Sequence, residues 1–168
     1  MSHVEISVKT AVYPIVYVAN EIMNTLIRIV DRRGLSMDYI NRHRETLLDG
    51  IFTWLSTRHL EKLVLEIYNG ETVIERHDLN FSYSKVVPST THSKFETNLR
   101  KLEDFLSKLP SLEEGLQYRV VVVLKEGAPD VPGWKPTRLR PVDHLRHQNL
   151  GDLIKADYIG VAFEYWGR

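Results

Sequence analysis

The chain has 168 residues, equal numbers of acidic and basic side chains (22 of each) and no cysteine. This length corresponds to one compact domain, and the lack of cysteine excludes a disulfide framework and thiolate metal sites. The zero net charge argues against a dedicated nucleic-acid coat, which carries a basic excess. Met1 to Thr10 is polar and no apolar run reaches membrane-span length, so we expect a cytoplasmic protein without membrane contact.

The first two predicted elements are helices. From about Thr10 to Arg32, apolar residues recur at intervals of three and four, which predicts a nearly buried helix. Ser36 is a suitable N-cap for a second helix, which is expected to end between Ser56 and His59.

The hydrophobic period then changes to two, which is typical of strands. Lys62 to Tyr68 alternates, and the Asn69-Gly70 pair that follows predicts a tight hairpin. Thr72 to Tyr83 is the expected partner strand. The segment from Ser84 to Thr91, which contains Pro88, is predicted to be a loop.

A third helix is expected to start at the capping box of Ser93 and Glu96 and to run to about Leu109. Tyr118 to Lys125 is a strand with apolar residues on both faces, typical of a central strand or one covered from both sides.

Gly127 to Gly151 holds four of the seven prolines and is predicted to be a long irregular segment, of a kind that is usually functional. Tyr158 to Trp166 is the last expected strand. Together these elements predict an α+β fold in which three helices pack on one face of an antiparallel sheet.

Motifs for catalysis are missing from the sequence. It contains no glycine-rich phosphate loop and no nucleophile elbow. His77 and Asp78 alternate on a strand and so point to opposite faces. His144 and His147 beside Asp143 have metal-ligand spacing, but a solvated loop fits them better because further ligands are not evident. We therefore expect no enzyme activity, no metal and no cofactor.

The proline-rich segment also carries a basic patch of four residues: Lys135, Arg138, Arg140 and Arg146. Such a patch can bind phosphate, an acidic partner or nucleic acid, or form a solvated loop face. Trp134 lies beside it, either pinning the loop or contributing to an interface.

The order of several short motifs resembles the HORMA domain family from about Val12 to Trp166. The motifs are Trp54-Leu55, Leu60 to Ile67, Val73 to Arg76, Leu109 to Glu113, Val131 to Trp134, and Tyr158 to Tyr165. The short loops and the lack of cysteine make the chain most similar to the bacterial HORMA proteins of CBASS antiviral operons.

The resemblance implies a single HORMA-like domain over residues 1–168, with a core of about 10–126 and a C-terminal safety belt of about 127–168. In this family the belt closes over a partner peptide, the closure motif, which pairs as an added strand. The third helix is then expected to form the floor beneath the peptide. The implied peptide-binding residues lie on the pairing strand, the third helix and the belt: Tyr118, Val120, Val122, Leu124, Leu99, Leu102, Trp134 and Leu139.

The resemblance also implies partners. They are a closure-motif peptide (from a partner that can be another HORMA protein), a cGAS/DncV-like nucleotidyltransferase that the closed form activates, and a pachytene-checkpoint-type AAA+ ATPase that engages the N-terminal segment. Arg100 matches a position at a HORMA–HORMA surface, or is simply a solvated arginine. Two alternatives stay open: a eukaryotic-type HORMA adaptor in chromosome or DNA-repair complexes, and a nucleic-acid-binding domain that uses residues 135–146.

Overall fold

The computed structural model describes residues 2–84 and 95–168, with 2–13 described by their backbone alone. Its helices are α1 (Ser2–Arg32), α2 (Asp38–Ser56) and α3 (Leu99–Ser107). Its strands are β1 (Leu60–Asn69), β2 (Thr72–Tyr83), β3 (Glu96–Thr97), β4 (Gln117–Leu124), β5 (Arg146–Ala156) and β6 (Ile159–Gly167). No helix of the described part is long and apolar enough to cross a membrane.

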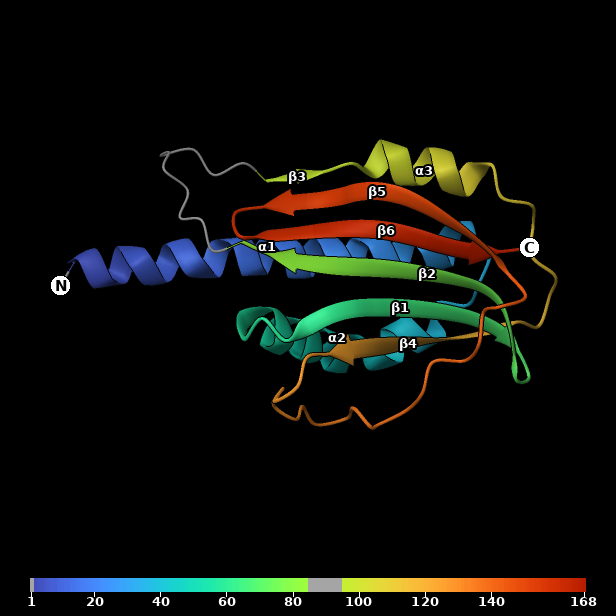
Figure 1. The fold of residues 1–168 in the computed structure, drawn as a ribbon, viewed down its shortest axis with the longest axis horizontal. Helices are drawn as coiled ribbons and strands as arrows, with labels where there is room; N and C mark the ends of the chain where they lie inside the picture. Colours follow the sequence, from blue (N-terminus) through green and yellow to red (C-terminus); the bar gives the residue numbers. More distant parts are fainter. Residues whose placement is uncertain (1, 85–94) are drawn as a thin grey trace.

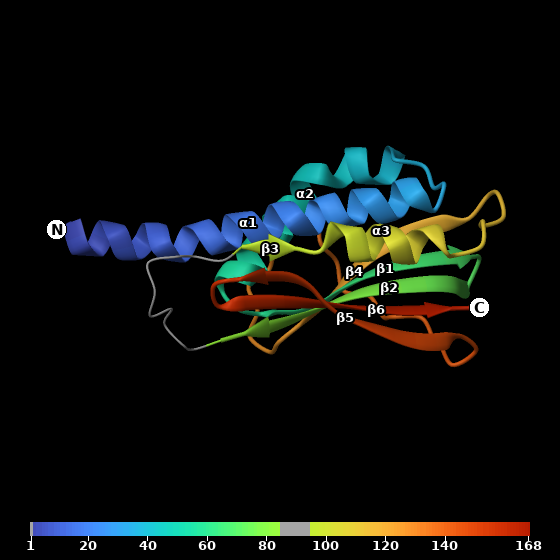
Figure 2. The ribbon, with the colours of Figure 1, turned by 90° about the horizontal axis from the view of Figure 1, so that it is seen from above.

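The strands form one antiparallel sheet in the order β3-β5-β6-β2-β1-β4, and the three helices cover one of its faces (Figures 1 and 2). This confirms the predicted α+β architecture. The sheet order places β4 at one edge and the β5–β6 hairpin on the opposite side of β2. β4 therefore lies apart from the C-terminal strands that follow it in the sequence.

The hydrophobic core lies between the helices and the sheet. Val18, Ile22 and Leu26 of α1 are at most 1% exposed, as their spacing predicts. The α2 helix begins after Ser36, whose hydroxyl accepts a hydrogen bond from the backbone N–H of Asp38 at 3.2 Å. Ser36 thus partners an N–H group at the start of this helix, although Met37 occupies the N-cap position.

The β1–β2 hairpin forms where Asn69-Gly70 predicts it. Gly70 has φ +61°, in the left-handed region that such turns require and that glycine adopts without a steric cost. Most of the predicted loop that follows β2 lies outside the described residues.

Three predictions were wrong. Glu96 does not take part in a capping box but lies in β3, and Asn98 caps α3 by accepting from the N–H of Lys101 at 3.1 Å; Ser93 lies outside the described residues. The predicted irregular stretch ends early, because β5 begins at Arg146. Of the two alternatives for Tyr118–Lys125, the central strand was wrong, because β4 lies at an edge of the sheet.

A buried ionic group joins α1 to β2 on the helical face of the sheet. The Arg33 Nε–H donates to Glu75 Oε1 at 3.0 Å, and His77 Nε2 lies 3.1 Å from the same oxygen. Burial alone would raise the pKa of Glu75, but His77 and Arg33 outweigh it and hold that pKa below its usual value. Because the folded-state pKa is depressed, this stabilisation is present above the unfolded pKa and is lost as the pH falls through the folded pKa.

We expect Arg33→Ala to lower the free energy of unfolding by about 3–5 kcal/mol, because it leaves the Glu75 carboxylate buried without its arginine. Its neighbour Arg32 is the matched control: its side chain is 57% exposed, and removing its ion pair with Glu103 should cost less than about 1 kcal/mol. Urea denaturation of both variants measures the difference. Equal losses would show that the buried pair contributes no more than the exposed one.

Candidate functional site

The outer edge of β4 presents backbone hydrogen-bonding groups. No other described strand pairs with β4 on the side away from β1. The Lys125 N–H donates to the carbonyl of His59, on the β1 side, at 2.8 Å. Since backbone groups alternate sides along a strand, those of the even-numbered residues Val120, Val122 and Leu124 point outward. This edge is suited to strand addition.

Residues 125–145, which we call the crossing segment, link β4 to β5. On the helical face the crossing segment is fixed to α2. Trp54 Nε1–H donates to the carbonyl of Pro129 at 2.8 Å, and Trp134 Nε1–H donates to the carbonyl of Thr46 at 2.8 Å. The two indole rings meet edge to face, 5.1 Å apart. Gly50 permits this contact, because a Cβ there would lie 2.5 Å from Trp134 Nε1.

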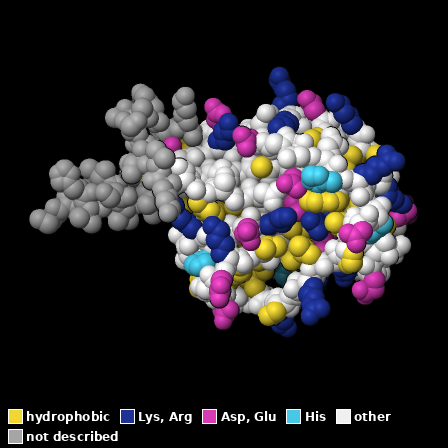
Figure 3. Space-filling view, in the orientation of Figure 1, with side chains coloured by type: hydrophobic (Ala, Val, Ile, Leu, Met, Phe, Trp, Pro, Cys, Tyr) yellow, Lys and Arg dark blue, Asp and Glu magenta, His cyan; other side chains and the backbone are white. Residues whose placement is uncertain are grey.

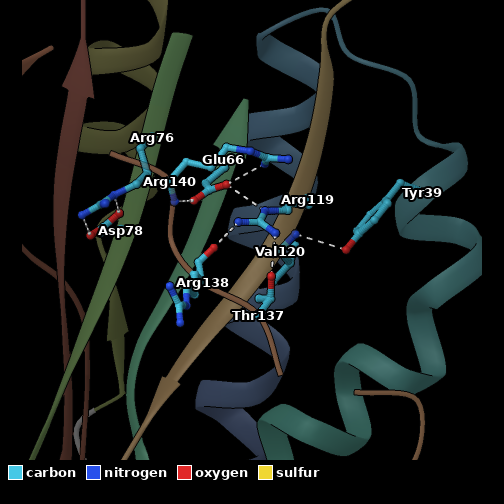
Figure 4. Close-up of polar contacts among 9 residues, drawn as sticks. All are labelled: Tyr39, Glu66, Arg76, Asp78, Arg119, Val120, Thr137, Arg138 and Arg140. Carbon is cyan, nitrogen blue, oxygen red and sulfur yellow. Dashed lines mark hydrogen bonds and ion pairs between the residues drawn. The ribbon is translucent and has the colours of Figure 1, made fainter. Parts of the chain in front are cut away.

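On the opposite face of the sheet the crossing segment is fixed to Glu66 of β1, whose side chain is fully buried (Figure 4). Arg119 Nε–H donates to Glu66 Oε1 at 2.7 Å, while Arg140 donates through its backbone N–H and its Nη1, both at 3.0 Å. Arg119 also donates to the Thr137 hydroxyl at 2.9 Å and to the carbonyl of Arg138. We call Glu66, Arg119 and Arg140 the Glu66 anchor.

The crossing segment therefore passes around the edge of β4, from α2 at Trp134 to the far face of the sheet at Thr137. It leaves a hollow of about 280 Å³ beside the strand, which Figure 3 shows between β4 and the crossing segment with hydrophobic side chains around it. The lining comes from α2, β4 and the crossing segment: Trp54, Val120, Val121, Val122, Leu124, Ala128, Pro129, Asp130, Val131, Trp134, Lys135, Pro136 and Thr137.

Four of the predicted peptide-binding residues meet at this hollow: Val120, Val122, Leu124 and Trp134. Tyr118 is on the same strand, but its hydroxyl donates to the carbonyl of Ser36 at 2.6 Å, so its side chain points to the start of α2. Leu139 is half-buried and does not line the hollow.

Leu99 and Leu102 lie elsewhere. Leu102 of α3 lies beside Leu153 of β5 and Phe163 of β6, and α3 covers the side of the sheet away from β4 (Figures 1 and 2). The prediction that the third helix forms the floor beneath β4 is wrong, because α2 occupies that place. Arg100 is exposed on α3, and its proposed role at a protein surface stays a prediction.

The basic patch is partly used within the fold. The Arg140 guanidinium is paired with Glu66 and lies 4.0 Å from the centre of the Tyr68 ring. Lys135, Arg138 and Arg146 have exposed side chains. The patch thus has fewer free charges than its sequence suggests.

The two histidines of the possible metal pattern have separate partners. His144 Nε2 lies 2.7 Å from the carbonyl of Val73, and His147 Nε2 lies 2.9 Å from the Glu164 carboxylate. Among the described residues, no three side chains of metal-binding type come together.

Sequence reasoning missed Glu66, Gly50 and Tyr39, whose hydroxyl accepts a hydrogen bond from the Val120 N–H at 3.1 Å. Glu66 had a detectable signal, since it is the acidic residue within the apolar run Leu63 to Ile67. A charge there requires a partner. Nothing in the local sequence indicates which arginines provide it, because they lie 53 and 74 positions away.

We expect Glu66→Gln to expose the crossing segment to trypsin at Arg138, the one basic residue of 135–140 that does not precede a proline. Hydrogen bonds to charged groups contribute about 1.5–3 kcal/mol, so cleavage should become about tenfold faster or more. Asp78→Asn is the control. Asp78 is another buried carboxylate, but its hydrogen bond at 2.9 Å comes from Arg76 of the same strand and not from the crossing segment. Mass spectrometry of the digests locates the cut. Equal cleavage in both variants would contradict the anchoring role of Glu66.

The fold is similar to solved HORMA structures. A chain of the mitotic checkpoint complex superposes with a TM-score of 0.75 at 15% identity, covering 94% of this chain and 96% of that chain. C. elegans HTP-2 bound to the HIM-3 closure motif gives 0.62 at 14% identity, with 83% of each chain covered. The E. coli MS115-1 CdnC:HORMA-deltaN complex gives 0.60 at 10% identity, with 90% of this chain and 86% of that chain covered.

At such low identities these likenesses show the fold alone, and no curated protein matches the chain in sequence. The family model described as bacterial HORMA domain 2, however, matches residues 1–168. The fold, the crossing segment around β4 and this match agree: the chain belongs to the bacterial HORMA domain 2 family.

Proposed function

We propose that this protein is a peptide-binding signalling adaptor. Its safety belt closes around a closure-motif peptide, and the closed form binds and activates a cGAS/DncV-like nucleotidyltransferase of a CBASS antiviral system. The main support for this proposal is that residues 125–145 are fixed to α2 on one side of β4 and to Glu66 on the other. This arrangement encloses an unpaired strand edge and an apolar hollow.

The physical chemistry of the edge favours an extended peptide as its ligand. The outward backbone groups of Val122 and Leu124 offer main-chain hydrogen bonds, and the hollow beside them offers apolar surface from Trp54 and Val131. The peptide can leave only when the crossing segment moves, so we expect its release to be slow. The protein acts in this proposal by binding, and not as an enzyme.

The partners in the proposal have separate support. A solved E. coli complex holds a related HORMA chain with CdnC, and C. elegans HTP-2 binds a closure motif. The start of α1 projects beyond the sheet (Figure 1). This position would let a pachytene-checkpoint-type AAA+ ATPase bind the N-terminal segment and reopen the belt.

The bacterial family assignment favours this role over that of a eukaryotic-type adaptor in chromosome or DNA-repair complexes. Direct nucleic-acid binding has weaker support, since Arg140 of the basic patch is already paired with Glu66.

We expect Val122→Pro to abolish peptide binding and nucleotidyltransferase activation while the fold persists. Proline removes the outward N–H of Val122, and an edge strand tolerates proline where the N–H faces away from the sheet. Peptide binding is measured with overlapping peptides that cover the proteins encoded beside this gene. Activation is measured as cyclic-oligonucleotide synthesis by the nucleotidyltransferase encoded there.

The conservative variant Val122→Thr keeps the N–H and a β-branched side chain, and should retain binding. Circular dichroism checks that both variants are folded. Peptide binding and activation that survive in a folded Val122→Pro variant would contradict strand addition at β4.

A further inference from the structure

We propose that Tyr39 is a stop at one end of the β4 edge and so sets the length of the peptide strand that pairs there. The proposal rests on the function proposed above and deepens it. Its central observation is that the outward N–H of Val120 already donates to the Tyr39 hydroxyl at 3.1 Å (Figure 4). A peptide added at β4 cannot use this N–H unless Tyr39 moves.

Tyr39 is held in position by its neighbours. It lies near the start of α2, and its ring packs against Tyr118 at 5.1 Å and His43 at 4.7 Å between centroids. Tyr118 is itself fixed by its hydrogen bond to the carbonyl of Ser36. Moving Tyr39 would therefore break its hydrogen bond to Val120 and disturb the ring packing together, which makes it a firm boundary.

On the face of the sheet away from the helices, the edge of β4 is covered at the same point along the strand. Arg119 precedes Val120, and its side chain, on the face away from the helices, binds Thr137 and the carbonyl of Arg138. The crossing segment thus returns to the sheet beside the position that Tyr39 covers. The hollow has the same limit, since its β4 lining runs from Leu124 to Val120 and includes neither Arg119 nor Tyr118.

The open part of the edge is consequently short. Val122 and Leu124 present both outward groups, whereas Val120 retains only its carbonyl for a peptide. Because successive paired residues of a strand are two positions apart, a peptide that pairs antiparallel with Val122 and Leu124 needs a core of three residues. Side chains of this core that face the hollow meet Trp54, Val131 and Trp134, so we infer that the core is apolar.

The test uses random dodecapeptides displayed on phage, selected against the full chain in its wild-type, Tyr39→Phe and Tyr17→Phe forms. Tyr17→Phe is the control, because its hydroxyl also makes one hydrogen bond (2.7 Å, to Thr97) but lies near β3. Selected peptides are shortened from each end and N-methylated one residue at a time. Amide hydrogen exchange of the bound proteins, read by NMR, shows which β4 residues are paired.

In the wild type and in Tyr17→Phe we expect a bound peptide to slow exchange at Val122 and Leu124 but not at Val120. In Tyr39→Phe the Val120 amide should exchange faster without peptide and become protected with it. Peptides long enough to reach Val120 should then bind about two- to tenfold more tightly to Tyr39→Phe than to the wild type, the gain from one added hydrogen bond.

Two results would overturn the proposal, and they are distinct. A peptide that protects Val120 equally in all three forms would show that Tyr39 is no stop, while strand addition at β4 would stand. Failure to select any peptide, or peptides that protect none of the three β4 amides, would refute the proposed function itself and the stop with it.

Discussion

The arrangement of the candidate site depends on one buried carboxylate. Glu66 is fully buried on the face of the sheet away from the helices, where an unpaired charge would be very unfavourable. It is neutralised by Arg119 from the neighbouring strand and by Arg140 from the crossing segment. One of its two arginines thus comes from the crossing segment, which in the proposed function moves to admit or release a peptide. Displacing that segment leaves Glu66 with Arg119 alone, which opposes opening.

The second attachment has a different chemistry. On the helical side the contact is mainly aromatic, with Trp134 seated against Trp54 over the bare backbone of Gly50. The attachment on the far face is ionic instead, with Glu66 bound to Arg119 and Arg140. The two ends of the wrap around β4 are therefore held by different kinds of interaction.

The sequence predicted those elements whose signals are local. The helical spacing of α1 and the Asn69-Gly70 turn are properties of short windows, and both elements form as expected. β5 was missed because its first four residues are exposed and two register shifts interrupt its alternation. The position of Leu102 was wrong because periodicity shows which face of a helix is buried but not which strand lies against it. The partners of Glu66 were hidden for a similar reason, since its salt bridges join residues far apart in sequence.

The exposed edge of β4 also creates a risk of aggregation. Four consecutive valines, Val120 to Val123, form an apolar strand with unpaired backbone groups, which is a template for association between chains. The crossing segment covers this edge without pairing with it, and Tyr39 occupies one of its donors. A second copy of the chain could pair with the strand only while the crossing segment is displaced, whereas the proposed single peptide, once enclosed, fits the hollow with the segment in place. The crossing segment thus disfavours edge-to-edge aggregation, which explains why so apolar an edge can lack a second strand partner in the described part of the fold.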